Sequence, residues 1–214
     1  GKLRSLLVTS AVAGEGKTTV VLNLAQSFAY AGQRVLVLDA DLRRPRVERV
    51  FELSKSPGLT EVLRGERKTD EVIRQPAGFG VDVLTSGDVP KNPAELLGST
   101  SFDQLLSELA DRYDLVVVDA PVLLAVSDAL LLAHRVDGVL LVHAPGKVDK
   151  KGFGRVREVL DRAGANVLGL VSNKVSVADP YQYPRYLHSP YVTVTNGPRW
   201  RLWRGRRASG SAGS

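Results

Sequence analysis

The chain has 214 residues, of which 43% are hydrophobic and 24% charged, which is the composition of a globular domain with a substantial core. It has no cysteine, which excludes disulfides and thiolate metal sites, and no window approaches the roughly 18 uninterrupted apolar residues of a membrane span. The net charge of +6 comes from residues 180–214, which hold six arginines and no acid, whereas residues 1–179 balance 23 basic against 23 acidic side chains, so we expect no nucleic-acid-binding face.

Apolar runs rich in β-branched residues predict five buried strands, at residues 6–10, 34–39, 114–119, 138–144 and 166–173. Helical patterns lie between these strands, at residues 17–30, 101–111, 127–135 and 150–164. The less regular segment 54–100 predicts short helices around one weak strand at 81–87. This alternation indicates an α/β fold with a doubly wound, mostly parallel sheet, helices on both faces and a ligand beyond the carboxyl ends of the strands.

The composition changes near residue 180, where a Pro-, Tyr- and Arg-rich segment begins that ends in the linker-like ASGSAGS. We therefore predict a folded nucleotide-binding domain over residues 1–179 and a mostly disordered tail over residues 180–214.

A glycine-rich stretch, AVAGEGKTT, joins the first predicted strand to the first predicted helix. Glycines let the backbone curl around phosphate with N–H groups pointing inward, and the helix start adds its positive dipole end. Lys17 would reach the β- and γ-phosphates of a nucleotide, and the Thr18 hydroxyl would bind Mg²⁺. A plain glycine turn before a helix is the alternative, and the strand–loop–helix context counts against it. The predicted nucleotide-binding residues are Ala13, Gly14, Glu15, Gly16, Lys17, Thr18 and Thr19.

Carboxylates end two further strands. Asp39 and Asp41 follow the second strand, in VLVLDADLRRP, and Asp119 ends the strand in YDLVVVDAP. We expect the second strand to lie beside the first, so that its end faces the phosphate loop. These carboxylates could hold Mg²⁺, and one of the first two could take a proton from an attacking hydroxyl. The alternative is that each aspartate only shapes a turn.

These three stretches resemble the Walker A, Walker A′ and Walker B motifs of the bacterial tyrosine kinases called BY-kinases, in the polysaccharide co-polymerase family of capsule and exopolysaccharide systems. The likeness covers roughly residues 3–177. It implies a P-loop NTPase fold, a kinase domain over residues 1–179, and ATP- and Mg²⁺-dependent transfer to tyrosine.

The resemblance also implies roles for individual residues. Lys17, Asp39 and Asp41 would be catalytic, with Asp39 as the base for the incoming tyrosine hydroxyl. Asn173 would read adenine with its amide, although it could equally be a polar residue at a strand end. The residues implied for Mg²⁺ are Thr18, Asp39, Asp41 and Asp119.

A kinase of this type needs acceptor tyrosines, and four of the six tyrosines lie within residues 181–191. A disordered tail can enter the active site of a neighbouring subunit, so we expect autophosphorylation between copies in a homo-oligomer. The alternative is a tail that packs elsewhere or nowhere. The predicted acceptors are Tyr181, Tyr183, Tyr186 and Tyr191.

The sequence departs from the family pattern in three places. Ala11 replaces the first Walker A glycine, Val122 replaces a proline, and the Glu/Arg oligomerisation helix that precedes Walker A is missing. Because the chain starts at Gly1 and has no methionine, we expect a fragment or an excised domain. The missing helix would lead toward a membrane-spanning activator, fused or separate, which predicts a cytoplasmic location at the inner face of the cell membrane.

Three other functions were weighed. A partition or septum-site ATPase would carry a lysine where this chain has Val12. A regulator that only binds nucleotide and gates a polysaccharide exporter would not need every motif residue intact. The tail could itself be functional, because Trp200 and Trp203 lie among five arginines and could rest on an anionic membrane, although a solubilising tail is the simpler explanation.

Overall fold

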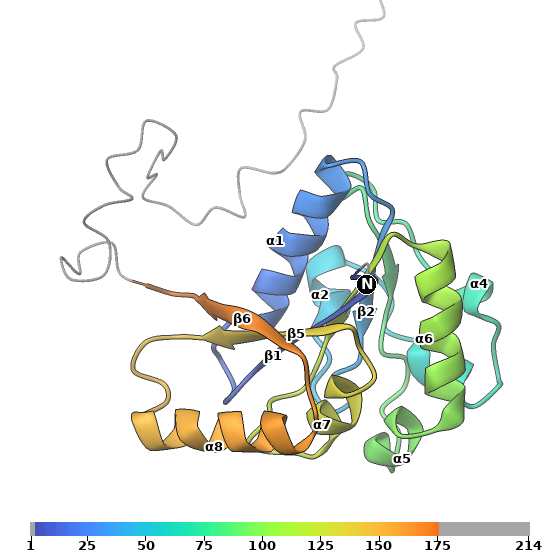
Figure 1. Cartoon of the computed structure of the whole chain (residues 1–214). Coiled ribbons are helices and arrows are strands. Elements are labelled where there is room, and N and C mark those ends of the chain that lie inside the picture. The colour runs from blue at the N-terminus through green and yellow to red at the C-terminus, as the bar shows by residue number, and fades with distance from the viewer. Residues whose placement is uncertain (1–2, 176–214) are drawn as a thin grey trace, which may run out of the picture. The chain divides into compact units, whose positions relative to one another are not determined.

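Six strands form one parallel sheet within residues 3–175, the part of the chain that this computed structural model describes (Figure 1). Their order across the sheet is β3-β2-β4-β1-β5-β6, and every neighbouring pair is parallel. All carboxyl ends therefore meet at one edge, as the predicted α/β fold requires. The strands are β1 (Ser5–Ser10), β2 (Val35–Asp39), β3 (Asp82–Leu84), β4 (Leu115–Asp119), β5 (Gly138–His143) and β6 (Val167–Ser172).

The five predicted strands and the weak sixth are confirmed, but the expected neighbour of β1 is wrong. β4 lies between β1 and β2, and it pairs with both. The error has a physical reason: β1, β2 and β4 are buried at every position, so their apolar patterns do not distinguish a central strand from its neighbours. This strand order brings two of the predicted site residues together, because Asp39 and Asp119 are direct partners in the register of β2 and β4.

Eight helices connect and cover the described strands. Side-chain caps fix two of their starts: the Ser99 hydroxyl accepts the Phe102 N–H, and the Asp149 carboxylate accepts the Gly152 N–H at 2.8 Å. The four long helical predictions are confirmed to within a few residues, and α3 and α5 are the predicted short helices. The helices are α1 (Lys17–Tyr30), α2 (Val47–Phe51), α3 (Leu59–Leu63), α4 (Thr69–Val72), α5 (Pro93–Leu97), α6 (Thr100–Arg112), α7 (Asp128–Ala133) and α8 (Lys150–Arg162).

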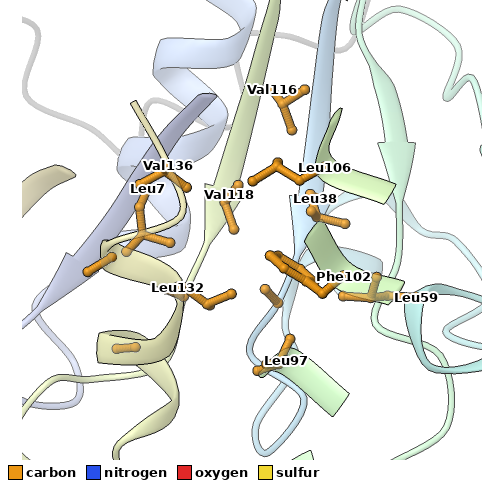
Figure 2. Close-up of a cluster of buried hydrophobic side chains, with 14 of the residues drawn as sticks. Leu7, Leu38, Leu59, Leu97, Phe102, Leu106, Val116, Val118, Leu132 and Val136 are labelled. Atoms are coloured by element: carbon orange, nitrogen blue, oxygen red, sulfur yellow. The ribbon is translucent and has the colours of Figure 1, made fainter. Parts of the chain in front are cut away.

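Helices cover both faces of the sheet, as predicted, and in Figure 1 β5 and β6 run between α1 above and α8 below. Along β4, Val117 packs with α1, whereas Val116 and Val118 belong to the core under α6 and α7. Figure 2 shows this second core, in which the fully buried Phe102 of α6 lies beside Leu38 of β2. Two separate cores thus clamp the central strands and fix the edge at which their carboxylates emerge.

Within residues 3–175, no helix combines the length and apolar character needed to cross a membrane. The predicted domain boundary, the acceptor tyrosines and the basic tail all lie outside the described residues, so they stay predictions.

Candidate active site

The phosphate loop lies between the end of β1 and the start of α1. Gly14 and Gly16 have φ of 82° and 94°, the left-handed region that other residues rarely adopt. A side chain at Gly16 would also collide with the Asn173 side chain. These two glycines therefore allow a tight loop whose backbone leads directly into the positive end of a 14-residue helix.

The first two residues of α1 reach the acidic edge of the sheet. Lys17 Nζ lies 3.9 Å from Asp41 Oδ2, and both side chains are nearly buried. The Thr18 hydroxyl donates to Asp119 Oδ2 at 2.6 Å. The predicted phosphate lysine and metal-binding hydroxyl thus lie against two of the three predicted carboxylates.

Two of the three carboxylates are held behind the surface. Asp39 is fully buried, with Oδ1 accepting the Asp41 N–H at 3.1 Å and Oδ2 accepting the Val47 N–H at 3.2 Å. Asp119 is 1% exposed, and its Oδ1 accepts no hydrogen bond from any described residue. A buried, unpaired carboxylate oxygen is costly unless a cation or a donor completes it.

Burial also changes the acidity of this pair. Burial and then the charge of Asp119 raise the pKa of Asp39 well above its ordinary value, although backbone N–H groups oppose the shift. Burial raises the pKa of Asp119 to about 6, with Lys17 and Thr18 opposing and Asp41 adding to the rise. Each of these neighbouring carboxylates makes ionisation of the other less favourable. A divalent cation between them would stabilise both ionised forms, so the pair suits a metal site.

The donor set suits Mg²⁺ better than a metal held wholly by protein. Within residues 3–175, no group of three acidic or histidine side chains converges to bind an ion alone. Mg²⁺ characteristically takes one or two protein oxygens and fills its octahedron with phosphate oxygens and water. Thr18 and Asp119, with Asp39 and Asp41 next to them, fit that requirement.

A pocket of about 660 Å³ opens over the phosphate loop. Asp41 lines it, whereas the buried Asp39 and Asp119 are not among its lining residues. Basic side chains dominate the charged part of the lining, as a polyphosphate site requires. These lining bases are Lys17, Arg43, Arg44, Arg46 and Lys174.

Asn173 lies against the phosphate loop rather than standing free beside it. Its amide Nδ2 donates to the Glu15 carbonyl at 2.9 Å, and Lys174 Nζ donates to the Gly14 carbonyl at 2.7 Å. The structure thus places Asn173 against the phosphate loop, next to Lys174, which lines the pocket, so a role in reading adenine stays a prediction.

One functional contact was missed by sequence reasoning. Arg43 donates to both carboxylate oxygens of Asp128, at 2.6 and 3.1 Å, and Asp128 is fully buried. This ion pair ties the loop after β2 to the start of α7 at the rim of the pocket. The adjacent arginines after Asp41 were the only signal in the sequence, and nothing in it indicated their partner 85 residues away.

Comparison with known proteins identifies the family. The AAA domain model matches residues 5–166. The chain is 39% identical to tyrosine-protein kinase YwqD of Bacillus subtilis over 185 residues, which cover 86% of this chain and 78% of that protein. It is 41% identical to tyrosine-protein kinase etk of Escherichia coli K12 over 170 residues, which cover 79% of this chain but only 23% of that longer protein.

Solved structures agree. The kinase domain of Escherichia coli tyrosine kinase ETK superposes with a TM-score of 0.79 at 39% identity, covering 83% of this chain and 70% of that one. The cell division ATPase MinD of Pyrococcus furiosus is more distant, with a TM-score of 0.69 at 28% identity, covering 82% and 74% of the two chains. With its P-loop sheet and its site of lysine, threonine and three aspartates, this chain belongs to the bacterial tyrosine-protein kinases and is an enzyme of that family.

Proposed function

We propose that this kinase uses ATP and Mg²⁺ to phosphorylate Tyr181, Tyr183, Tyr186 and Tyr191 of a neighbouring copy. The observation that carries the use of Mg²⁺ is the unpaired, buried Oδ1 of Asp119 beside the Thr18 hydroxyl, opposite a phosphate loop. Bound Mg²⁺ would neutralise charge on the β- and γ-phosphates. Transfer of this kind depends on positioning and electrostatics, and the buried sheet edge supplies a rigid frame for both.

The chain's own residues would divide the work as follows. Backbone N–H groups of residues 13–19 and the Lys17 ammonium would bind the phosphates, while Thr18 and Asp119 would bind the metal. Asp39 and Asp41 would complete the metal's surroundings. The charge of Lys17 would also hold Asp119 ionised, since that ammonium lowers its pKa.

The base that accepts the tyrosine proton is proposed to be Asp39, on the family resemblance. Asp41 is the alternative that the geometry supports, because it lines the pocket, whereas Asp39 is fully buried and occupied by backbone N–H donors. A general base must come within hydrogen-bond reach of the proton it accepts. Substitution of each residue separates the two assignments.

Adenine recognition is proposed for Asn173. Its Nδ2 already donates to the Glu15 carbonyl, which leaves its Oδ1 to accept from an adenine amino group. An amide that binds the base and the phosphate loop at once would align the two ends of the nucleotide.

The setting of the enzyme is also proposed. The relatives "Putative tyrosine-protein kinase CapB" of Staphylococcus aureus and "Putative tyrosine-protein kinase EpsB" of Ralstonia solanacearum support a role in capsule or exopolysaccharide production. We infer a homo-oligomeric kinase at the inner face of the cell membrane, next to a membrane-spanning activator, that regulates polysaccharide synthesis and export. Contact of Trp200, Trp203 and the tail arginines with anionic lipid is proposed as an addition, and flotation with vesicles, with and without residues 198–214, tests it.

The deciding experiment incubates the full chain with γ-labelled ATP and Mg²⁺, followed by mapping of modified residues by mass spectrometry. Label on residues 181–191 supports the proposal, and mixing an inactive Tyr-bearing copy with an active copy lacking these tyrosines tests transfer between copies. Free phosphate without labelled protein would instead support an ATPase of the MinD type.

A further inference from the structure

Glu15 places a carboxylate inside the phosphate loop, and this side chain is fully buried. Its Oε2 accepts the Val12 N–H at 3.0 Å, within the loop. Its Oε1 accepts the Ala144 N–H at 3.1 Å, just beyond the end of β5. The carboxylate therefore ties the loop to the sheet through two backbone groups that are 132 residues apart in the chain.

A negative charge at this place is unexpected from electrostatics alone. The loop is proposed to bind phosphate, and the Glu15 carboxylate would repel phosphate because the protein interior screens charges poorly. Within residues 3–175, the titratable side chain that contacts the Glu15 carboxylate is His143, whose Nδ1 lies 3.4 Å from Oε1. A residue that opposes phosphate binding must contribute something other than affinity.

The contacts indicate what that contribution is. Val12 N–H is directed to Glu15, so it is committed to the shape of the loop rather than to a phosphate. The main chain of Glu15 is held in turn by the Asn173 amide, and that of Gly14 by Lys174. The loop is thus braced on one side by β5 and on the other by the residues that follow β6.

We infer that Glu15 is a positioning residue for phosphoryl transfer, whose carboxylate fixes the phosphate loop so that Lys17 and Thr18 face Asp41 and Asp119. The inference rests on the proposed nucleotide site. It assigns to the side chain a role that the motif itself attributes only to the backbone. Without the carboxylate, the loop loses its attachment to β5, while the cationic groups that attract phosphate stay in place.

If Glu15 positions the loop, its substitution should lower kcat while leaving the Kd for nucleotide nearly unchanged. Glu15→Gln keeps the size of the side chain but removes its charge, and its amide can accept from only one of the two backbone N–H groups. Nucleotide binding should hold or tighten because a repelling charge is gone, while the misaligned loop slows transfer.

The chain offers a matched control in Glu61, which is 6% exposed. Its carboxylate also joins two backbone N–H groups from separate segments, Gly58 at 2.6 Å and Asp88 at 2.9 Å, but none of these residues lines the nucleotide pocket. Glu61→Gln should lose stability for the same physical reason without affecting the phosphate loop.

The experiment uses the 214-residue chain as wild type, Glu15→Gln and Glu61→Gln. It measures unfolding by urea, the Kd for Mg-ATP, and kcat and KM for both tyrosine labelling and ATP hydrolysis. We expect Glu15→Gln to lower kcat at least tenfold with Kd changed less than threefold, and Glu61→Gln to change both less than twofold. Equal kinetics in the two variants, or a rise in KM at unchanged kcat, would overturn the inference.

Two additions keep the test decisive. If Glu15→Gln does not fold, Glu15→Asp is judged by the same criteria, because it keeps the charge but is too short to span both contacts. ATP hydrolysis is measured as well as tyrosine labelling so that the two proposals can fail separately. A wild type that hydrolyses ATP without labelling tyrosine would contradict the proposed function. The effect of Glu15→Gln on hydrolysis would still decide the inference about Glu15.

Discussion

Asp39 and Asp119 are direct partners in the register of β2 and β4, and both carboxylates are buried. Partner residues of adjacent strands lie about 5 Å apart, so two like charges face each other with little solvent between them. The fold therefore holds a repulsion that Lys17 and Thr18 offset in part and that protonation or a bound cation would relieve further.

The first prediction concerns pH. The pKa of Asp119 is about 6 in the folded protein and 3.8 ordinarily, so between these values the folded state binds a proton that the unfolded state has lost. Unfolding free energy should therefore fall as pH rises through this window, by about 1–3 kcal/mol, with the loss complete above pH 6. Urea unfolding without Mg²⁺ at pH 5 and pH 7.5 measures it.

Asp119→Asn is the control for that measurement. The variant lacks the buried charge, so without metal it should be more stable than wild type at pH 7.5. Its free energy of unfolding should also differ much less between pH 5 and pH 7.5 than that of wild type. It should also lose stabilisation by Mg²⁺. An unchanged pH dependence in the variant would assign the effect to other groups.

Lys17→Met should abolish labelling, by at least about a thousandfold, because it removes the ammonium that contacts Asp41 and would bind phosphate. Methionine keeps the unbranched shape and most of the length of the lysine side chain, so the fold should survive, as circular dichroism can confirm. Lys91→Met, at an exposed lysine away from the pocket, is the matched control. Strong residual labelling in Lys17→Met would remove this lysine from the mechanism.

Asp39→Asn and Asp41→Asn decide which aspartate is the base. If Asp39 is the base, its variant should lose transfer by about 10²–10⁴-fold while Mg-ATP binding, measured by calorimetry, is largely kept. Its amide must also face backbone N–H donors, so some stability should be lost. A larger loss of transfer in Asp41→Asn, with Asp39→Asn affecting mainly stability, would move the role to Asp41.

Much of this site could be predicted because parallel strands end at one edge. Asp39, Asp119 and the phosphate loop each follow an apolar strand, so the sequence predicts that all three lie at the same edge of the sheet, and the neighbouring positions of β2, β4 and β1 bring them together. The order itself was not predictable, since β1, β2 and β4 have equally buried patterns. α2 and α4 were not predicted either, because they are as short as α3 and α5 but lack the start signals of those helices, the capping box with Glu61 and the proline at the first turn.

Side-chain partners across the chain were the other gap. Glu15 reads as one more loop residue, and only the fold brings it against Ala144. Arg43 and Asp128 likewise meet because the loop after β2 reaches the start of α7. Such contacts depend on tertiary positions that no local pattern encodes.

The Arg43–Asp128 pair should respond asymmetrically to substitution. Arg43→Ala leaves the fully buried Asp128 carboxylate without its donor and should cost about 1–3 kcal/mol. Asp128→Asn leaves an arginine that is 42% exposed and can be solvated, so it should cost less. Urea unfolding of both single variants and the double variant measures the coupling, and equal single losses would contradict this account.

The last prediction separates acceptor tyrosines from a structural one. Tyr113 is 9% exposed, and its hydroxyl donates to Asp82 Oδ2 at 2.6 Å. Burial and this hydrogen bond raise its pKa, so the hydroxyl is neither accessible nor readily deprotonated. Tyr113→Phe should therefore keep full labelling and lose about 1 kcal/mol of stability, whereas replacing Tyr181, Tyr183, Tyr186 and Tyr191 together with Phe should remove the label without changing urea unfolding. Label that persists in the fourfold variant would place the acceptor elsewhere in the chain.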